Sequence, residues 1–371
     1  MPKKTHHAER PIHVGFVALA DSAPLIMARE LGLFAKHGLN VVLHREVGWA
    51  TIRDKILYGE LDAAQAPAGL VVAASCGLGT VQVECLTGLV LNLHGNAITL
   101  SQDLWKRGVR DGQSLRQEVY FSRREPLTLG VVHPFSSHNI LLRQWLLRHN
   151  LQPDRDVRIV VVPPPQLPGN LKAGHIDGYC VGEPWTSMAV LSRTGWCPAI
   201  SAELAPDHPE KVLMVTRAFA EQHHERHIAL IAALIEACRF CERLENRDRI
   251  METLALRKNV GAPIQALRMS LGSTFDFGNG RIEKVPHFHV FAEGNANDPT
   301  IERARWVIDG LQTCGLADPE SVPEEGIPRW FRSDLYRQGC ARVAQFCSDD
   351  SKGLETSEGH RRDESCHNES A

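Results

Sequence analysis

The chain contains two successive series in which short apolar runs alternate with helical patterns. The first series fills the N-terminal part of the chain, and the second begins after the polar connection at residues 106–126. Strands that alternate with amphipathic helices are typical of right-handed βαβ units and a mostly parallel sheet. Each series is long enough to build a sheet of its own. The pattern therefore predicts an α/β protein with two lobes and a cleft between them.

The individual elements can be placed from the apolar periodicity. In the first series we expect strands at residues 12–19, 40–47 and 80–90, with helices at residues 23–39, 50–60 and 68–79. In the second series we expect strands at residues 127–132, 157–162 and 176–181, with helices at residues 137–150, after 163–170, and at 184–193.

The same reading gives the expected domain boundaries. Residues 11–100 form the first part of lobe 1 and residues 101–211 form lobe 2. Residues 212–347 form a mostly helical return segment that packs back on lobe 1, with its longest amphipathic run at residues 226–246. Residues 348–371 contain almost no apolar side chain, so we expect a disordered tail.

Composition excludes several classes of function. The 371 residues exceed the size of one hydrophobic core, and a net charge of −3 offers no basic excess for a phosphate backbone. We therefore expect no direct nucleic-acid binding. No run of about 18 apolar residues is present, so no membrane span is expected. The N-terminal segment lacks the apolar core of a secretory signal, and ten cysteines show no framework spacing. Both features favour a cytoplasmic protein with free thiols.

Motifs for catalysis and cofactors are absent from the sequence. There is no phosphate-binding G-x-x-x-x-G-K, no G-x-S-x-G nucleophile turn and no G-x-G-x-x-G after the first strand. Cys238 and Cys241 lie in an apolar helical pattern without a second metal-ligand pair, which favours core packing. The stretch HIDGYCVGEPW at residues 175–185 combines His, Asp, Cys and Glu, but Cys180 ends a strand and Glu183 starts a helix. We expect no catalytic residue, no metal and no cofactor.

Polar residues gather instead at the carboxyl ends of the expected strands, the edge where open α/β sheets bind ligands. Several of these loops open a helix, where backbone N–H groups and a partial positive charge favour an anion. The pattern indicates a receptor for a small anion. The positions are Asp21, residues 48–51 (GWAT), 94–97 (HGNA), 133–138 (HPFSSH), 182–185 (GEPW) and 207–211 (DHPEK).

Six phrases in a fixed order make the sequence resemble the nitrate- and bicarbonate-binding proteins of ABC uptake systems. This group is a branch of the two-lobed periplasmic-binding-protein superfamily, and the resemblance implies its type II fold with a ligand cleft between the lobes. The likeness covers residues 11–345. The phrases stand at residues 13–39, 47–69, 91–101, 137–146, 160–185 and 207–219.

The resemblance also implies a set of ligand-binding residues. In the nitrate receptors of the family, a Trp, an amide, a His and a Lys hold the anion, and these match Trp49, Asn96, His138 and Lys211, with the Gly182 backbone nearby. Lys211 would supply the compensating charge, and charge-assisted hydrogen bonds contribute about 1.5–3 kcal/mol each. An ion of four atoms gains at most about 6 kcal/mol at the usual ceiling per atom. A closed cleft without water is therefore expected.

Two departures from the family pattern leave the ligand open. Asn96 stands where transport receptors carry the longer Gln, and Ala50 stands where Gly often follows the Trp. Nitrate, nitrite and bicarbonate all remain candidates, with nitrate or nitrite as the expected ligand.

The expected cytoplasmic location distinguishes two uses of this fold. The chain resembles the cytoplasmic nitrate/nitrite sensors that pair with an antiterminator protein carrying an RNA-binding domain. In those systems the ligand-free sensor sequesters the antiterminator, and the anion releases it. The first alternative is a substrate-binding component of an ABC transporter for nitrate, nitrite or bicarbonate. The second is an enzyme related to thiamin-precursor synthases, for which the CRFCER phrase at residues 238–243 is a poor match.

Overall fold

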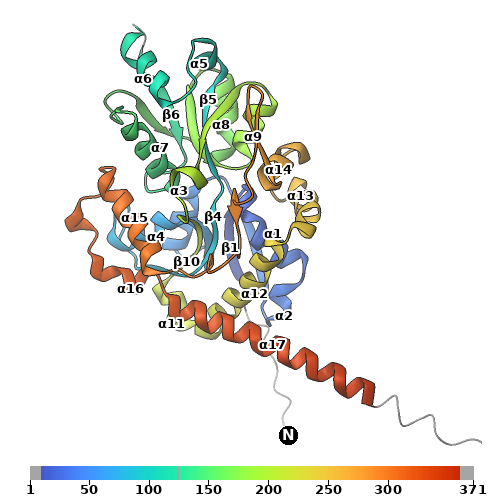
Figure 1. The fold of residues 1–371 in the computed structure, drawn as a ribbon. Helices are drawn as coiled ribbons and strands as arrows, with labels where there is room; N and C mark the ends of the chain where they lie inside the picture. Colours follow the sequence, from blue (N-terminus) through green and yellow to red (C-terminus); the bar gives the residue numbers. More distant parts are fainter. Residues whose placement is uncertain (1–9, 123–124, 360–371) are drawn as a thin grey trace, which may run out of the picture.

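Two separate β-sheets organise the protein (Figure 1). The computed structural model describes residues 10–122 and 125–359. The larger sheet has the strand order β13-β4-β10-β3-β1-β2, and the smaller sheet has the order β7-β6-β8-β5-β9. We call the larger sheet with its helices lobe 1 and the smaller sheet with its helices lobe 2. The α/β class and the two-lobed architecture expected from the sequence are confirmed.

The strands of lobe 1 combine parallel and antiparallel pairs. β1 pairs in parallel with β2 and β3, whereas β10 runs antiparallel between β3 and β4. The strands of this sheet are β1 (Ile12–Val17), β2 (Val41–Glu46), β3 (Ala63–Pro67), β4 (Cys85–His94), β10 (Pro209–Thr216) and β13 (His289–Val290).

Lobe 2 repeats this plan with a shorter sheet. β6 pairs in parallel with β7 and β8, and β5 runs antiparallel to β8 and β9. The strands are β5 (Asn96–Ser101), β6 (Thr128–Val131), β7 (Arg158–Val161), β8 (Gly178–Gly182) and β9 (Gly195–Ile200). A separate hairpin is formed by β11 (Thr274–Gly278) and β12 (Arg281–Lys284).

Helices cover both sheets (Figure 1). Most of the side chains that they bury are apolar. The N-terminal helices are α1 (Ala23–Glu30), α2 (Leu33–Lys36), α3 (Trp49–Leu57) and α4 (Ala68–Cys76). Lobe 2 contains α5 (Gln102–Lys106), α6 (Gly112–Phe121), α7 (Ser137–Arg148), α8 (Leu167–Lys172), α9 (Trp185–Leu191) and α10 (Ser201–Leu204). The return segment contains α11 (Arg217–Gln222), α12 (His224–Glu242), α13 (Arg247–Ala255), α14 (Ile264–Leu271), α15 (Ile301–Thr313), α16 (Ile327–Trp330) and α17 (Ser333–Gly359).

Three differences from the expected elements have local causes. The strand expected from residue 80 begins at Cys85, because Val83 N donates to Ala74 O and ties the preceding residues to the end of α4. The polar connection contains helix α6, which is nucleated by a capping box between Asp111 and Ser114. α17 continues to Gly359, past the start of the expected tail, and residues 360–371 lie outside the described residues.

The return segment contacts both lobes. The sequence predicts packing on lobe 1, and α12 indeed packs against α1 and α17. β11 also contacts β9 of the smaller sheet, and α14 contacts α9. This segment therefore links the lobes in addition to the two direct chain crossings between them.

The first crossing is the tight connection from β4 to β5. Gly95 has a φ of +91°, and a Cβ atom placed there would lie 2.4 Å from the His289 ring. Both conditions require glycine, since L side chains rarely adopt this conformation. The second crossing runs from α10 to β10 and carries His208 into the region between the lobes.

The lobes contact each other directly away from these crossings. Ala20 N donates to Glu183 O at 2.7 Å, and Trp185 Nε1 donates to Ala18 O at 3.1 Å. At Gly69, a Cβ atom would lie only 2.1 Å from the carbonyl oxygen of Phe135 in lobe 2. The structure is thus a closed arrangement of the lobes.

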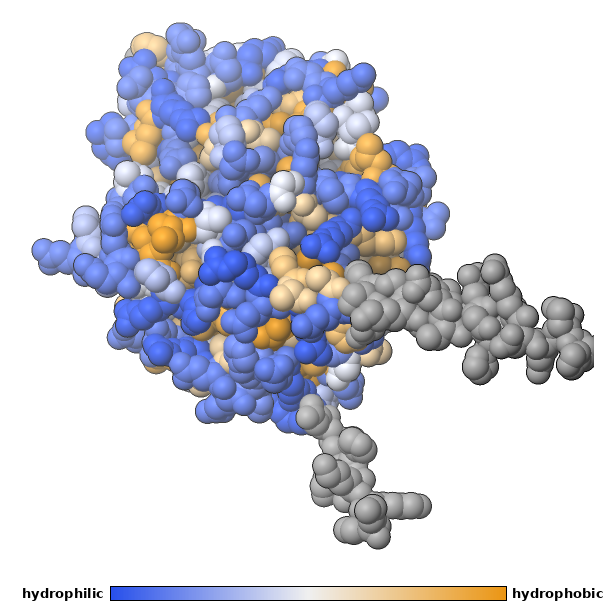
Figure 2. Space-filling model, turned by 60° about the horizontal axis from the view of Figure 1, so that its bottom comes forward, coloured by the Kyte–Doolittle hydropathy of each residue, from blue (hydrophilic) through white to orange (hydrophobic). Residues whose placement is uncertain are grey.

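The surface is mostly polar on the face that Figure 2 presents, and hydrophobic side chains gather there only in separate small areas. The apolar side chains instead form a large interior cluster that includes Cys238 and Cys241, as expected for the CRFC pair. Within the described part of the chain, no helix has the length and apolar character that crossing a membrane requires.

The contact at Gly69 predicts that Gly69→Ala holds the lobes apart. An overpacked contact costs about 1–3 kcal/mol, and lobe opening relieves it without unfolding. Small-angle X-ray scattering should show a larger radius of gyration for this variant than for wild type. Gly169→Ala is the matched control, because a Cβ atom at Gly169 meets no atom within 4 Å. Equal radii for all three proteins would contradict the closed contact.

Candidate ligand-binding site

A buried lysine lies at the centre of the region between the lobes. Lys211 is the third residue of β10, and its side chain is 0% exposed. Its Nζ atom lies 2.9 Å from Asp21 Oδ2 and 2.5 Å from Glu210 Oε1. Both carboxylates are also 0% exposed. The lysine charge is therefore already balanced by the protein.

The pKa directions follow from these contacts. Burial lowers the pKa of Lys211, but the carboxylates of Asp21 and Glu210 outweigh it and raise the pKa above its ordinary value. Burial raises the pKa of Glu210, but the Lys211 charge holds it well below the usual range. At Asp21 burial prevails over the attraction of Lys211, so its pKa is raised. Of the two acids, Glu210 is thus the more firmly ionised.

Asp21 belongs to the short helix η1 (Ala20–Ser22) that follows β1. Its Oδ1 atom accepts a hydrogen bond of 2.6 Å from Gln65 Nε2, and Gln65 Oε1 accepts from Val17 N at 3.4 Å. Asp21 is therefore fixed by lobe 1 alone. It holds Lys211 in place from the carboxyl end of β1, one of the strand ends where the sequence predicts ligand contacts.

Lobe 2 contacts the cluster through Glu210. Asn96 Nδ2 and Ser137 Oγ each donate to Glu210 Oε2 at 2.5 Å. His138 Nε2 lies 3.5 Å from Glu210 Oε1, and His208 Nε2 lies 3.4 Å from Glu210 Oε2. Asn96 is the first residue of β5, and Ser137 is the first residue of α7. Element ends of lobe 2 thus converge on one carboxylate held by lobe 1.

Trp49 covers the lysine from lobe 1. It is the first residue of α3 and is 1% exposed, and Lys211 Nζ lies 5.2 Å from its ring centroid. That distance is within the range of a cation–π contact. The ring therefore forms a flat wall beside the ammonium group, as the sequence predicts for a planar ligand.

Several polar atoms in this cluster have no hydrogen-bond partner among the described residues. They are Trp49 Nε1, Asn96 Oδ1, His208 Nε2 and both ring nitrogens of His138. Buried polar groups are normally satisfied, so unused ones at one place indicate a ligand site. Burial also lowers the pKa of His138 to about 3, so at neutral pH its ring can donate only one hydrogen bond.

Gly182 lines the same cluster at the end of β8, opposite Asn96 in the strand pairing. A Cβ atom there would lie 3.3 Å from both Asn96 Oδ1 and Asp21 Oδ2. The missing side chain allows both polar groups to approach the Gly182 backbone.

The structure brings Trp49, Asn96, His138, Gly182 and Lys211 together, and their role in ligand binding stays a prediction. One expectation about charge must be changed. The sequence predicts that Lys211 supplies the compensating charge for an anion, but in this structure two carboxylates already pair with it. The net formal charge of these three groups is negative when both acids are ionised.

Sequence reasoning missed the role of Glu210 because neighbouring residues in a regular strand point to opposite faces. Here β10 shifts register against β4 between Pro209 and Lys211 and again between Lys211 and Val212. Such irregularities redirect side chains. Glu210 and Lys211 therefore both reach the cluster, and only their adjacency to the predicted site could have suggested it.

The stretch at residues 175–185 serves mainly as scaffold. Cys180 is buried in β8, and burial raises the pKa of its thiol well above the ordinary value. Glu183 Oε2 accepts from Ser187 N at 3.1 Å in the first turn of α9. Burial raises the pKa of Glu183 to about 7. Gly182 is the residue of this stretch whose backbone lies against Asn96 and Asp21 of the cluster.

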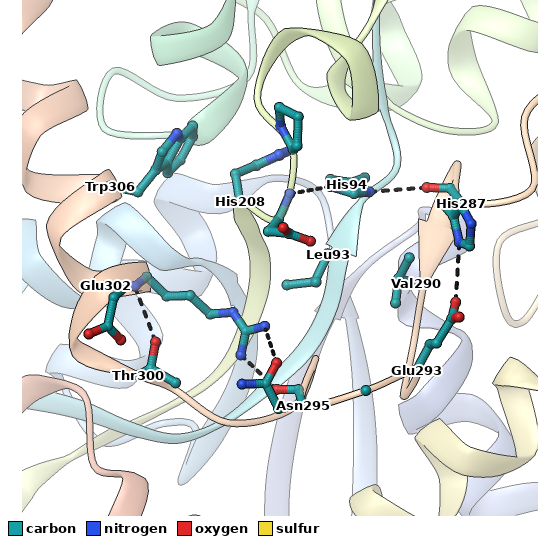
Figure 3. Close-up of a pocket in the computed structure, with 14 residues that line it drawn as sticks. Leu93, His94, His208, His287, Val290, Glu293, Asn295, Thr300, Glu302 and Trp306 are labelled. Carbon is teal, nitrogen blue, oxygen red and sulfur yellow. Dashed lines mark hydrogen bonds and ion pairs between the residues drawn. The ribbon is translucent and has the colours of Figure 1, made fainter.

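A pocket adjoins the cluster next to the two chain crossings (Figure 3). It has a volume of about 710 Å³, and its lining includes His94, His208 and Trp306. His94 Nε2 accepts from Asp207 N at 2.8 Å, and His94 Nδ1 lies 3.0 Å from His287 O. His208 is shared by the pocket and the Glu210 cluster. Its ring therefore separates open space from the buried polar groups.

The described residues contain no cluster of side chains that could form a metal-binding site. No group of three or more His, Cys, Asp or Glu side chains in this part of the chain is placed to hold a metal ion. The acids of the cluster are instead paired with Lys211 and with amide and hydroxyl donors.

Two α/β lobes with a buried polar cluster between them define a two-lobed binding protein of the periplasmic-binding-protein type. Comparison with known proteins then identifies the family: the chain belongs to the NMT1-like family, whose model matches residues 6–255. Among solved structures, the periplasmic nitrate-binding protein NrtA from Synechocystis superposes with a TM-score of 0.85 at 25% identity, covering 90% of this chain and 89% of that chain. The alkanesulfonate-binding protein SsuA from Xanthomonas axonopodis shares the fold, with a TM-score of 0.66 at 16% identity over 86% and 99% of the two chains.

Sequence relatives give the same family. The nitrate import ATP-binding protein NrtC from Synechocystis is 37% identical over 90% of this chain, and the match spans 50% of that protein. The nitrate/nitrite binding protein NrtA from Synechococcus elongatus is 29% identical, covering 93% of this chain and 81% of that protein. The chain thus spans about half the length of the NrtC and CmpC relatives. The family and fold expected from the motifs are confirmed.

The buried ion network predicts a strong effect of removing its cation. Lys211→Met leaves Glu210 and Asp21 without a counter-charge, and breaking a buried pair destabilises a fold by about 3–5 kcal/mol. Adding Glu210→Gln should recover most of this loss. Denaturant unfolding of the single and double variants measures both effects. Lys55→Met is the control, since Lys55 and Glu46 form a partly exposed pair that contributes little to stability.

The same variant should acquire a distinct pH dependence. Without Lys211, burial raises the folded-state pKa of the acids, so their contribution to stability is lost as pH rises. The loss of unfolding free energy caused by Lys211→Met should therefore be larger near about pH 8 than near about pH 5. A deficit that is small, or equal at both pH values, would contradict the network.

Proposed function

We propose that the protein is a receptor that binds nitrate or nitrite between its lobes without converting it. The observation that carries this proposal is the set of unused buried ring nitrogens of Trp49 and His138 around Lys211. They come from both lobes, so a ligand held there would bridge them. The names of the NrtA relatives support the choice of ligand.

The arrangement suits a small planar oxyanion. Trp49 offers a flat face and an indole N–H, while His138 offers a ring N–H from the opposite lobe. The Asn96 amide donor also faces this region, and in this structure it is bonded to Glu210. Full burial strengthens each of these contacts, because water no longer screens the charges. A ligand that contacts both lobes favours the closed form by its differential affinity.

We further propose that lobe closure is the signal that the protein transmits. In this role it is a cytoplasmic nitrate/nitrite sensor that controls an antiterminator protein with an RNA-binding domain. The open, anion-free form would hold the partner, and closure on the anion would change the surface that the partner contacts. Support comes from the motif resemblance described above and from the position of the cluster between the lobes.

A second candidate is a substrate-binding component of an ABC transporter for nitrate, nitrite or bicarbonate. The observation that favours it is the naming of relatives as nitrate import and bicarbonate transport proteins. Both candidates require anion binding at the same cluster, and they differ in the partner that the closed form contacts.

Calorimetric titration with nitrate, nitrite and bicarbonate tests the shared binding step. We expect at least one of these anions to bind wild type, and His138→Ala to bind it about 10- to 150-fold more weakly, the loss of one charge-assisted hydrogen bond. Lys211→Ala should lose binding to a similar or larger extent. His175→Ala is the control, since His175 is exposed on lobe 2.

Unfolding transitions of each variant identify any variant that fails to fold. If Lys211→Ala fails to fold, the binding test rests on His138→Ala. Equal affinity of wild type and His138→Ala would remove the site assignment.

Co-purification distinguishes the sensor from the transport component. We expect the antiterminator to be retained by the anion-free protein and released when nitrate or nitrite is added. Gly69→Ala should retain the partner at anion concentrations that release it from wild type, because it resists closure. A complex unchanged by saturating anion would contradict the release mechanism.

A further inference from the structure

The Glu210 carboxylate occupies the position that the proposed ligand would need. Asn96 Nδ2 and Lys211 Nζ, two of the predicted ligand donors, are each bonded to its oxygens at 2.5 Å. His138 Nε2, a third predicted ligand donor, lies 3.5 Å from the same group. Ser137 Oγ adds a further bond of 2.5 Å. The predicted anion contacts are therefore already made to a side chain of the protein.

A carboxylate and a nitrate ion share the relevant chemistry. Both are planar oxyanions with charge spread over equivalent oxygens, and both only accept hydrogen bonds when ionised. Donors arranged for one therefore suit the other. Nitrate would compete with the carboxylate for these donors, because Asn96 Nδ2 and Lys211 Nζ both bond to the Glu210 oxygens in this structure.

Charge makes the competition stronger. Glu210 and Asp21 face the single cation Lys211 in a site where all three side chains are 0% exposed. A bound anion would add a further negative charge at low local dielectric, where like charges repel strongly. A buried acid can avoid this repulsion by taking up a proton. Glu210 is the acid whose donors the anion would take, so it is the one that loses the contacts keeping it ionised.

We propose that Glu210 is an internal competitor for the anion, an inference that rests on the proposed function. Nitrate then binds only as Glu210 gives up its hydrogen-bond donors and takes up one proton from solvent. Nitrate affinity consequently falls as pH rises. Glu210 is then a residue that sets affinity and selectivity. Lys211, freed from one carboxylate, becomes the cation that the anion meets.

Two titratable groups that face Glu210 keep a fixed protonation state at neutral pH in the empty site. Burial keeps His138 neutral and the Cys180 thiol protonated. The charged and titratable groups facing the carboxylate are Lys211 on β10, Asp21 on η1, His138 on α7, Cys180 on β8 and His208 before β10.

Calorimetry with sodium nitrate on the full chain tests this inference. Nitrate is suitable because it remains a fully ionised anion across the whole accessible pH range. Titrations in two buffers of different ionisation enthalpy count the protons exchanged. We expect wild type to take up about one proton per nitrate and to lose affinity about tenfold per pH unit above neutrality.

Glu210→Gln should bind nitrate without proton uptake and with little pH dependence. Near about pH 8 it should bind at least about tenfold more tightly than wild type, because the neutral amide competes more weakly for charged donors. Glu293→Gln is the control, since Glu293 has a side chain 61% exposed at the rim of the neighbouring pocket. It should behave as wild type.

Three results would overturn the inference while leaving the receptor function intact. They are nitrate binding by wild type without proton uptake, proton uptake that persists in Glu210→Gln, and weaker binding by Glu210→Gln than by wild type at high pH. The proton count on wild type stands even if the variant fails to fold. No binding of nitrate, nitrite or bicarbonate by any of these proteins would instead reject the proposed function.

Discussion

A buried lysine held between two carboxylates is the interaction on which this structure depends. Lys211 and Glu210 lie on β10 of lobe 1, yet Glu210 accepts hydrogen bonds from Asn96 and Ser137 of lobe 2. The ion network is therefore also a joint between the lobes. Charges buried this deeply are tolerated only when paired and hydrogen-bonded, so opening the lobes would have to rehydrate them.

This joint relates ligand binding to lobe position. The Glu210 carboxylate bridges the lobes in this structure, and an anion that replaces it would preserve the bridge while changing its chemistry. The close approach at Gly69 and the bond from Ala20 N to Glu183 O define how near the lobes come. The ion network around Lys211 and the steric contacts at Gly69 and Ala20 therefore both act on the opening and closing of the lobes.

The sequence predicted the parts of this account that follow from periodicity and motif order. Alternating strands and helices indicated two sheets, and the family phrases identified Trp49, Asn96, His138, Gly182 and Lys211, which the structure brings together. It could not indicate that Glu210 faces the same way as Lys211, because that depends on register shifts between β10 and β4. Nor could it reveal that Lys211 is already paired with Asp21, since this contact joins residues far apart in the chain.

The most direct test of the central claim is a crystal structure of the protein saturated with nitrate. We predict a planar ion between the lobes, against Trp49 and bonded to Lys211, Asn96 and His138, with the Glu210 carboxyl turned away from those donors. A saturated crystal in which the ion lies elsewhere, while Glu210 keeps its bonds to Asn96 and Lys211, would contradict it.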